Sequence, residues 1–146
     1  MDIELENRIS NAFIYPNKRE RFLFDRFEKH NDRSRMDAVC RLPEIIDASL
    51  KMKKDNHFPA PDDLIKILKA HGVGDTCYVI SDFEGFDGVI APIEEAVNTL
   101  NTNGFPSLIV GLPSGFAHLK EESYASYQPN CFVRPRIRLD GIPWDN

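Results

Sequence analysis

The hydrophobic pattern of the chain changes period once, near residue 75, and this change constrains the fold more than any other feature. Before it, apolar residues recur at helical spacing, as in Leu23 and Phe27 or Leu64 and Leu68. After it, the run 76–80 is rich in β-forming residues and is bounded by turn residues. Helices followed mainly by strands predict an α+β domain.

The first half of the chain predicts a series of helices with identifiable ends. We expect helices over residues 18–29, 36–40, 43–54 and 61–71. Asn17 is the expected N-cap of the first, and Ser34 that of the second. Pro43 is expected as the first residue of the third, because proline lacks the N–H that a helix interior needs. Gly72 is expected to end the fourth in a left-handed conformation.

The second half predicts strands at residues 76–80, 107–112, 116–119 and 131–139, with a helix over 92–102. A strand, a helix and a strand within about 35 residues favour a right-handed βαβ unit with parallel strands. The last strand contains Pro135, which cannot donate to a ladder, and is therefore expected to be an edge strand or a broken one. The predicted fold is a single α+β domain over residues 1–146, with N-terminal helices packed on a small mixed sheet of about four strands.

Composition limits the class of protein. The 146 residues are 42% apolar and 28% charged, which is typical of a globular chain and excludes a disordered one. No basic and apolar leader and no long apolar run is present, so neither secretion nor a membrane span is expected. Three widely spaced cysteines make a poor disulfide framework. We therefore expect a cytoplasmic protein with buried thiols at Cys40, Cys77 and Cys131.

Negative charge is concentrated in the second half, where residues 61–146 hold 6 basic and 12 acidic side chains, a net of 6 − 12 = −6. Within it, residues 75–95 contain six acids and no Lys or Arg. The centre of this segment, residues 82–88, follows the first strand as a loop. It is interpretable as a solvated turn, as a surface that docks a basic partner, or as a cation site. The spacing does not match a calcium loop. The candidate partner-binding residues are Asp82, Phe83, Glu84, Phe86 and Asp87.

Two basic stretches are candidates for a nucleic-acid site. Residues 18–35 carry seven basic side chains, but four acids alternate with them, which favours a solvated helix face over a phosphate track. Arg134, Arg136 and Arg138 alternate and would share one face of a strand, which makes them the better anion site. Nucleic-acid binding is the less favoured alternative.

The search for catalytic chemistry assigns no catalytic residue, metal or cofactor. No phosphate-binding loop, zinc pattern or nucleophile motif is present. A pocket at the carboxyl ends of the expected parallel strands, near 81–82 and 112–114, is the enzyme alternative, with His118 and Glu122 as acid–base candidates. The stretch 77–122 is similar in general character to small bacterial proteins, and no motif in it identifies a family.

The favoured hypothesis is a small non-enzymatic interaction protein, such as an inhibitor or an immunity-type module, that binds a basic protein.

The single tryptophan, Trp144, leads to an expectation about the C-terminal tail. A tryptophan buries on the order of 200 Å² of surface, so we expect the tail to dock, either on its own domain or across a homodimer contact. The sequence leaves monomer and homodimer open.

Overall fold

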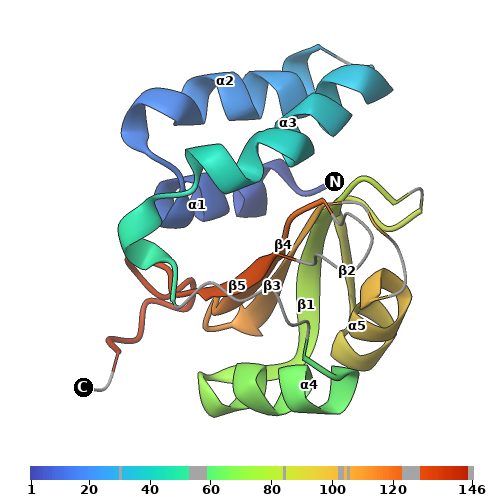
Figure 1. Cartoon of the computed structure of the whole chain (residues 1–146). Helices are drawn as coiled ribbons and strands as arrows, with labels where there is room; N and C mark the ends of the chain where they lie inside the picture. Colours follow the sequence, from blue (N-terminus) through green and yellow to red (C-terminus); the bar gives the residue numbers. More distant parts are fainter. Residues whose placement is uncertain are drawn as a thin grey trace.

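The computed structural model describes residues 1–29, 31–52, 59–83, 85–101, 104, 106–122 and 129–144. A sheet lies between two layers of helices (Figure 1). The α-helices are α1 (Ile3–Phe13), α2 (Arg19–Leu23), α3 (Asp32–Ile45), α4 (Pro61–Ala70) and α5 (Ile93–Asn101). Shorter helical turns are η1 (Pro16–Lys18), the π-helix η2 (Phe24–Glu28) and η3 (Ala48–Leu50). The strands are β1 (Val73–Ser81), β2 (Val89–Pro92), β3 (Ser107–Pro113), β4 (Ala117–Lys120) and β5 (Asn130–Val133).

The α+β class is confirmed, but the predicted sheet is wrong in its details. The sheet has five strands in the order β2-β1-β3-β4-β5, and every neighbouring pair is antiparallel. The expected parallel pairing of β1 with β3 is replaced by an antiparallel one, in which Ser81 lies opposite Ser107.

The missed strand β2 explains this difference. It follows β1 through the loop 82–88 and pairs back onto it, with Val79 opposite Val89. The chain has therefore already reversed when it enters α5, and β3 returns antiparallel to β1. Strands β2 and β3 run in the same direction, but β1 lies between them. The sequence hid β2 because it has only four residues and ends at Pro92, which cannot donate a ladder hydrogen bond.

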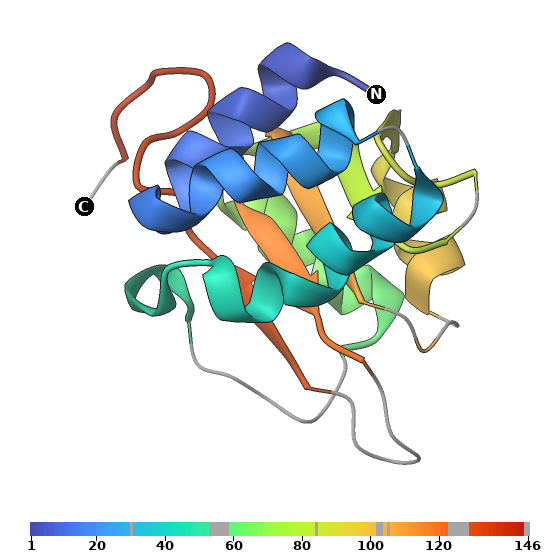
Figure 2. The ribbon, with the colours of Figure 1, turned by 90° about the horizontal axis from the view of Figure 1, so that it is seen from above.

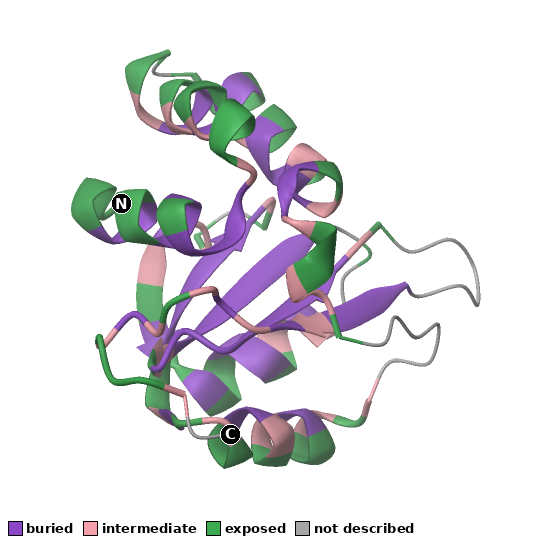
Figure 3. Cartoon of the chain, turned by 90° about the vertical axis from the view of Figure 1, so that its left-hand side faces the viewer, coloured by how far each residue is buried: buried purple, intermediate pink, exposed green. Residues whose placement is uncertain are grey.

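Alternating side chains of the strands fill two cores, one on each face of the sheet. Tyr78 and Ile80 of β1 point into the core under α1, α2 and α3, whereas Cys77 and Val79 point into the core under α4 and α5. Viewed from the side, the buried strands lie between helices whose outer faces are exposed (Figure 3). The three N-terminal helices cover the first face together (Figure 2).

Helix α1 was not predicted, although its signals are present. The side chain of Asp2 caps it by accepting a hydrogen bond from the Leu5 N–H, 2.9 Å away. Leu5, Ile9 and Phe13 are buried at helical spacing. The acidic residues between them concealed this periodicity.

The predicted helix over 43–54 is wrong. Pro43 lies inside the last turn of α3, which ends at Ile45. Ile46 then forms an isolated β-bridge with Ile14 instead of continuing a helix, and the Asp47 N–H donates to the Phe13 carbonyl at 2.8 Å. Residues 46 and 47 therefore pair with the end of α1 and its following residue instead of forming the predicted helix. Lys53 and Lys54 lie outside the described residues.

The expected caps also differ. No side chain caps η1 or α2, so the cap predicted at Asn17 is wrong. Asn31 caps α3, accepting from the Ser34 N–H at 2.8 Å, where Ser34 itself was expected as the cap. Helix α4 begins at Pro61 and is followed by Gly72 with φ +81°, as predicted.

Strand β5 lies at a sheet edge and ends at Val133, six residues before the predicted end and two before Pro135, as expected of a strand that is both at an edge and broken. The three arginines that were expected on one strand face are therefore used separately. Arg136 pairs with Asp47 at 2.8 Å, and Arg138 pairs with Asp140 at 2.7 Å.

Trp144 of the tail contacts its own chain, as the intramolecular alternative expects, and docking across a homodimer contact stays a prediction. The indole N–H of Trp144 donates to the Pro135 carbonyl at 3.2 Å. The guanidinium groups of Arg134 and Arg138 lie 4.6 and 5.0 Å from the centre of its ring.

Among the described residues, no helix has the length and apolar character that crossing a membrane requires.

Candidate functional site

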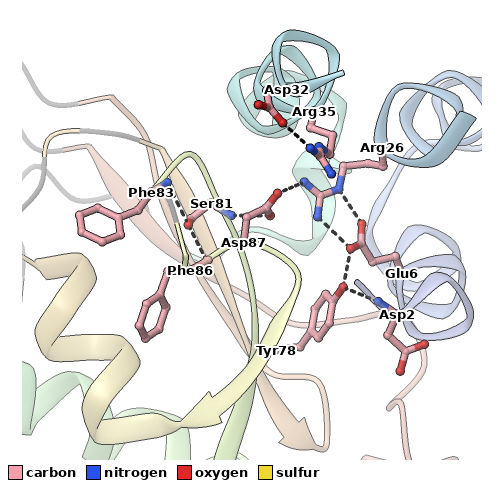
Figure 4. A network of polar contacts seen from close by, with 10 residues as sticks. All are labelled: Asp2, Glu6, Arg26, Asp32, Arg35, Tyr78, Ser81, Phe83, Phe86 and Asp87. Carbon is pink, nitrogen blue, oxygen red and sulfur yellow. Dashed lines mark hydrogen bonds and ion pairs between the residues drawn. The ribbon is translucent and has the colours of Figure 1, made fainter. Parts of the chain in front are cut away.

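The most unusual feature of the structure is an ion cluster buried between the N-terminal helices and β1 (Figure 4). Arg26 donates two hydrogen bonds to the Glu6 carboxylate, from Nε at 2.7 Å and from Nη2 at 2.8 Å. Both side chains are fully buried. Arg26 also donates from Nη1 to Asp87 at 2.8 Å. One guanidinium therefore joins α1, η2 and the loop after β1.

Tyr78 completes the cluster from the sheet below. Its hydroxyl donates to Glu6 and accepts from the Asp2 N–H, 3.2 Å away. Burial first, and then the Glu6 charge, raise the pKa of Tyr78, so its hydroxyl stays protonated. Burial alone would lower the pKa of Arg26, but Glu6 and Asp87 outweigh burial and raise it. Arg26 thus stays charged and the Tyr78 hydroxyl stays protonated, as the hydrogen bonds that each donates require.

The loop 82–88 is attached to this cluster through Asp87. Besides its bond from Arg26, Asp87 accepts a hydrogen bond from the Ser81 N–H at 3.2 Å. The Ser81 hydroxyl donates to the Phe86 carbonyl at 2.7 Å and accepts from the Phe83 N–H at 3.2 Å. These bonds join both ends of the loop to Ser81 at its base.

A glycine allows the chain to leave the loop in this geometry. Gly88 has φ +69°, a conformation that residues with a side chain rarely adopt. A Cβ atom there would lie only 2.1 Å from Cγ of Met1. The N-terminus and the loop are therefore in close contact.

The candidate residues of the loop have different surroundings. Phe83 is 36% exposed and points away from the ion cluster in Figure 4. Phe86 is half-buried and packs against the core under α5. The two rings meet edge to face, with centroids 6.5 Å apart. Asp82 is half-buried, and Asp87 is tied to Arg26. Glu84 lies outside the described residues.

The acidic run 75–95 does not form one surface. Because Thr76 lies opposite Pro92, Asp75 and the exposed Glu94 and Glu95 lie at the end of β1 opposite to the loop. Asp75 also pairs with Lys69 at 3.3 Å. Only the loop itself carries the candidate surface.

The enzyme alternative expected a pocket where the carboxyl ends of β1 and β3 meet, and these two ends do not meet. In the antiparallel pair β1–β3, the carboxyl ends of the two strands lie at opposite ends of the sheet, so Ser81 and residues 112–114 are far apart. His118 is buried, and its Nε2 lies 3.1 Å from Oδ1 of Asn130. Burial is the main cause that lowers the pKa of His118 to about 4. Glu122 is exposed.

The basic stretch 18–35 is partly used for internal contacts. Arg26 belongs to the buried cluster, Arg35 pairs with Asp32, and Arg19 donates to the backbone carbonyls of Ile14 and Asn11.

The expectation that all three cysteines are buried is wrong for one of them. Cys77 and Cys131 are buried, whereas Cys40 is exposed on α3.

Sequence reasoning missed Glu6, Arg26 and Tyr78 as functional candidates. The sequence signal that could have identified Glu6 and Arg26 is a charged residue on an otherwise apolar helix face. Glu6 precedes Phe13 by seven residues, and Arg26 follows Phe22 by four, so each lies on the stripe of a buried aromatic residue. A charge at such a position indicates a buried partner, but the partner's identity depends on the tertiary fold.

Among the described residues, no group of three or more His, Cys, Asp or Glu side chains is placed to hold a metal ion. No protein-family model, curated protein or solved structure matches the chain.

Proposed function

We propose that the chain is a non-enzymatic interaction protein, of the inhibitor or immunity type, that binds a basic protein through the loop 82–88. The observation that supports it most is the attachment of this loop, through Asp87, to a buried ion cluster. Phe83 is exposed and Asp82 is half-buried beside it.

Such an arrangement suits binding for an entropic reason. A loop that is ordered before binding loses little conformational freedom when a partner arrives, so more of the contact energy contributes to affinity. Aromatic residues, phenylalanine among them, are also enriched in the buried core of protein interfaces. Phe83 supports this role.

The electrostatics of Asp82 favour a cationic partner. Burial and the nearby charge of Asp87 raise the pKa of Asp82, which means that its negative charge is disfavoured in the free protein. A Lys or Arg side chain brought to this position would stabilise that charge. We place this function in the cytoplasm, and the three free thiols support this placement.

An affinity capture from a lysate of the source cells tests the proposal. The bait is the full chain or its double variant Asp82→Asn/Phe83→Ala, and mass spectrometry identifies the captured proteins. We expect wild type to retain a protein with a high isoelectric point and the double variant to lose it. Retention should also fall as salt rises, because salt screens charge pairs at an interface rim.

The matched control is Asp62→Asn/Ile137→Ala. It removes the same charge and one exposed apolar side chain, but on α4 and in the C-terminal tail. It should capture the same protein as wild type. An unchanged set of captured proteins with the loop variant, or an equal loss with the control, would refute the role of the loop.

A further inference from the structure

A second surface lies between α1 and the helix that carries Arg26. A trough of about 530 Å³ runs between α1 and the continuous helix formed by α2 and η2. Figure 2 shows these helices side by side. The apolar floor of the trough consists of Ile3 from α1 with Leu23, Phe24 and Phe27. Ile3 is 58% exposed and Phe24 is 48% exposed, which is unusual for large apolar side chains.

The π-helix η2 explains why these aromatic residues face outward. Asp25 and Arg26 are adjacent in sequence, and both are buried. Asp25 is held by Arg41 and Arg21, while Arg26 reaches Glu6 and Asp87. The wider π turn brings both charges inside and leaves Phe24 and Phe27 on the trough. Short π turns are rare and frequently occur at functional sites.

The rim of the trough is acidic. Glu4, Glu20 and Glu28 line it, and no Lys or Arg does. All three carboxylates are exposed. Within the described part of the chain, none of them forms an ion pair. The rim therefore presents three exposed carboxylates, none of them in an ion pair with a described residue, around an apolar floor.

The lining residues of α2 and η2 recur over two helical turns, from Glu20 to Glu28, which corresponds to about 12 Å along the axis. An elongated apolar trough between two helices matches the way in which an amphipathic helix binds in a groove. We propose that this trough docks an amphipathic α-helix of a partner protein, with an apolar face on Phe24 and basic residues opposite the acidic rim. This goes beyond the proposed role of the loop, because it involves other residues and specifies the element that binds.

Fluorescence anisotropy at about 0.15 M salt, where long-range charge attraction is screened, tests the proposal with defined probes. The first probe is a labelled helical peptide of about 14 residues, about 21 Å long, with Leu on one face and Lys on the other. The second has the same composition in a scrambled order that forms no apolar face. The third carries Glu in place of Lys. We expect the first peptide to bind, and the other two to bind at least about tenfold more weakly.

Variants of the trough locate the binding. Phe24→Glu and Glu20→Lys/Glu28→Lys should each raise the dissociation constant of the first peptide by about tenfold or more. Met36→Glu and Glu94→Lys/Glu95→Lys make matching changes at exposed residues of α3 and α5 and should leave it unchanged. The loop variant Asp82→Asn/Phe83→Ala should also leave it unchanged, which separates this proposal from the first. Circular dichroism confirms that each variant is folded.

Three results would overturn the assignment. One is equal binding of the ordered and scrambled peptides. Another is binding that the trough variants do not weaken. The third is a wild-type dimer in analytical ultracentrifugation that Phe24→Glu dissociates, because the occupant of the trough would then be a second copy of this chain.

Discussion

Replacing Arg26 with Met should destabilise the protein strongly, and the structure indicates by how much. Arg26 is fully buried and donates three charge-assisted hydrogen bonds, two to Glu6 and one to Asp87. Met has a similar length but no charge. Asp87, with a side chain that is 23% exposed, regains water after the change. Glu6 does not, because it is fully buried.

The loss therefore comes mainly from Glu6. Its carboxylate would remain in the interior without the cation that compensates it, and removal of one partner from a buried ion pair costs about 3–5 kcal/mol. Urea unfolding measures this loss. With a slope of about 2 kcal/mol per molar, the midpoint should fall by about 1.5–2.5 M.

Two comparisons make the expectation specific to the buried pair. Arg35→Met breaks the exposed pair with Asp32 and should cost less than about 1 kcal/mol. The double variant Glu6→Leu/Arg26→Met removes both charges and should recover more than half of the loss. A loss below about 1 kcal/mol for Arg26→Met, or no recovery in the double variant, would show that the cluster is not the buried ion pair described above.

Three further predictions concern the sheet and the tail. Gly111→Ala should destabilise the protein by about 1–3 kcal/mol in urea unfolding, because its Cβ would lie 2.3 Å from Cγ2 of Val73, while Gly74→Ala, with no neighbour nearer than 3.5 Å, should be tolerated. The unfolded chain protonates His118 near pH 6.5, but the folded protein does so only near pH 4, so stability should fall as the pH drops between these values. The loss amounts to about 3 kcal/mol at pH 4, and His118→Asn should lack this part of the decline. The fluorescence maximum of Trp144 should lie below that of indole in water and should not move on dilution, since the tail docks on its own chain; a red shift on dilution would indicate docking across a dimer.

Local signals were sufficient where a segment's conformation depends on its own residues. Helix α4 has a proline at its start, acids in its first turn and a left-handed glycine after its end, and it was predicted within one residue. Strands β1 and β3 carry runs of apolar and β-branched residues, and both were predicted. The loop 82–88 was also located, because its glycines and acids interrupt these runs.

The direction of the strands depended on more than their composition. Four residues of β2 reverse the chain and change β3 from a parallel to an antiparallel neighbour of β1. Ile46 was expected in a helix, but it pairs with Ile14 across the chain. In both cases a contact between distant segments outweighed the local preference, which is weak for short elements.

The candidate sites also divide into features that local sequence determines and features that depend on contacts between distant segments. The sequence by itself determined the α+β class, helices α2, α4 and α5, strands β1, β3 and β4, and the position of an acidic aromatic loop. Only the tertiary structure decided that Asp87 of this loop faces Arg26, that Glu6 is buried beside it, and that Phe24 remains exposed on a trough. Arg26 lies 20 residues from Glu6 and 61 from Asp87. Hydrophobic periodicity reports only on neighbours within a turn or along a strand, so no local pattern specifies which distant charges meet.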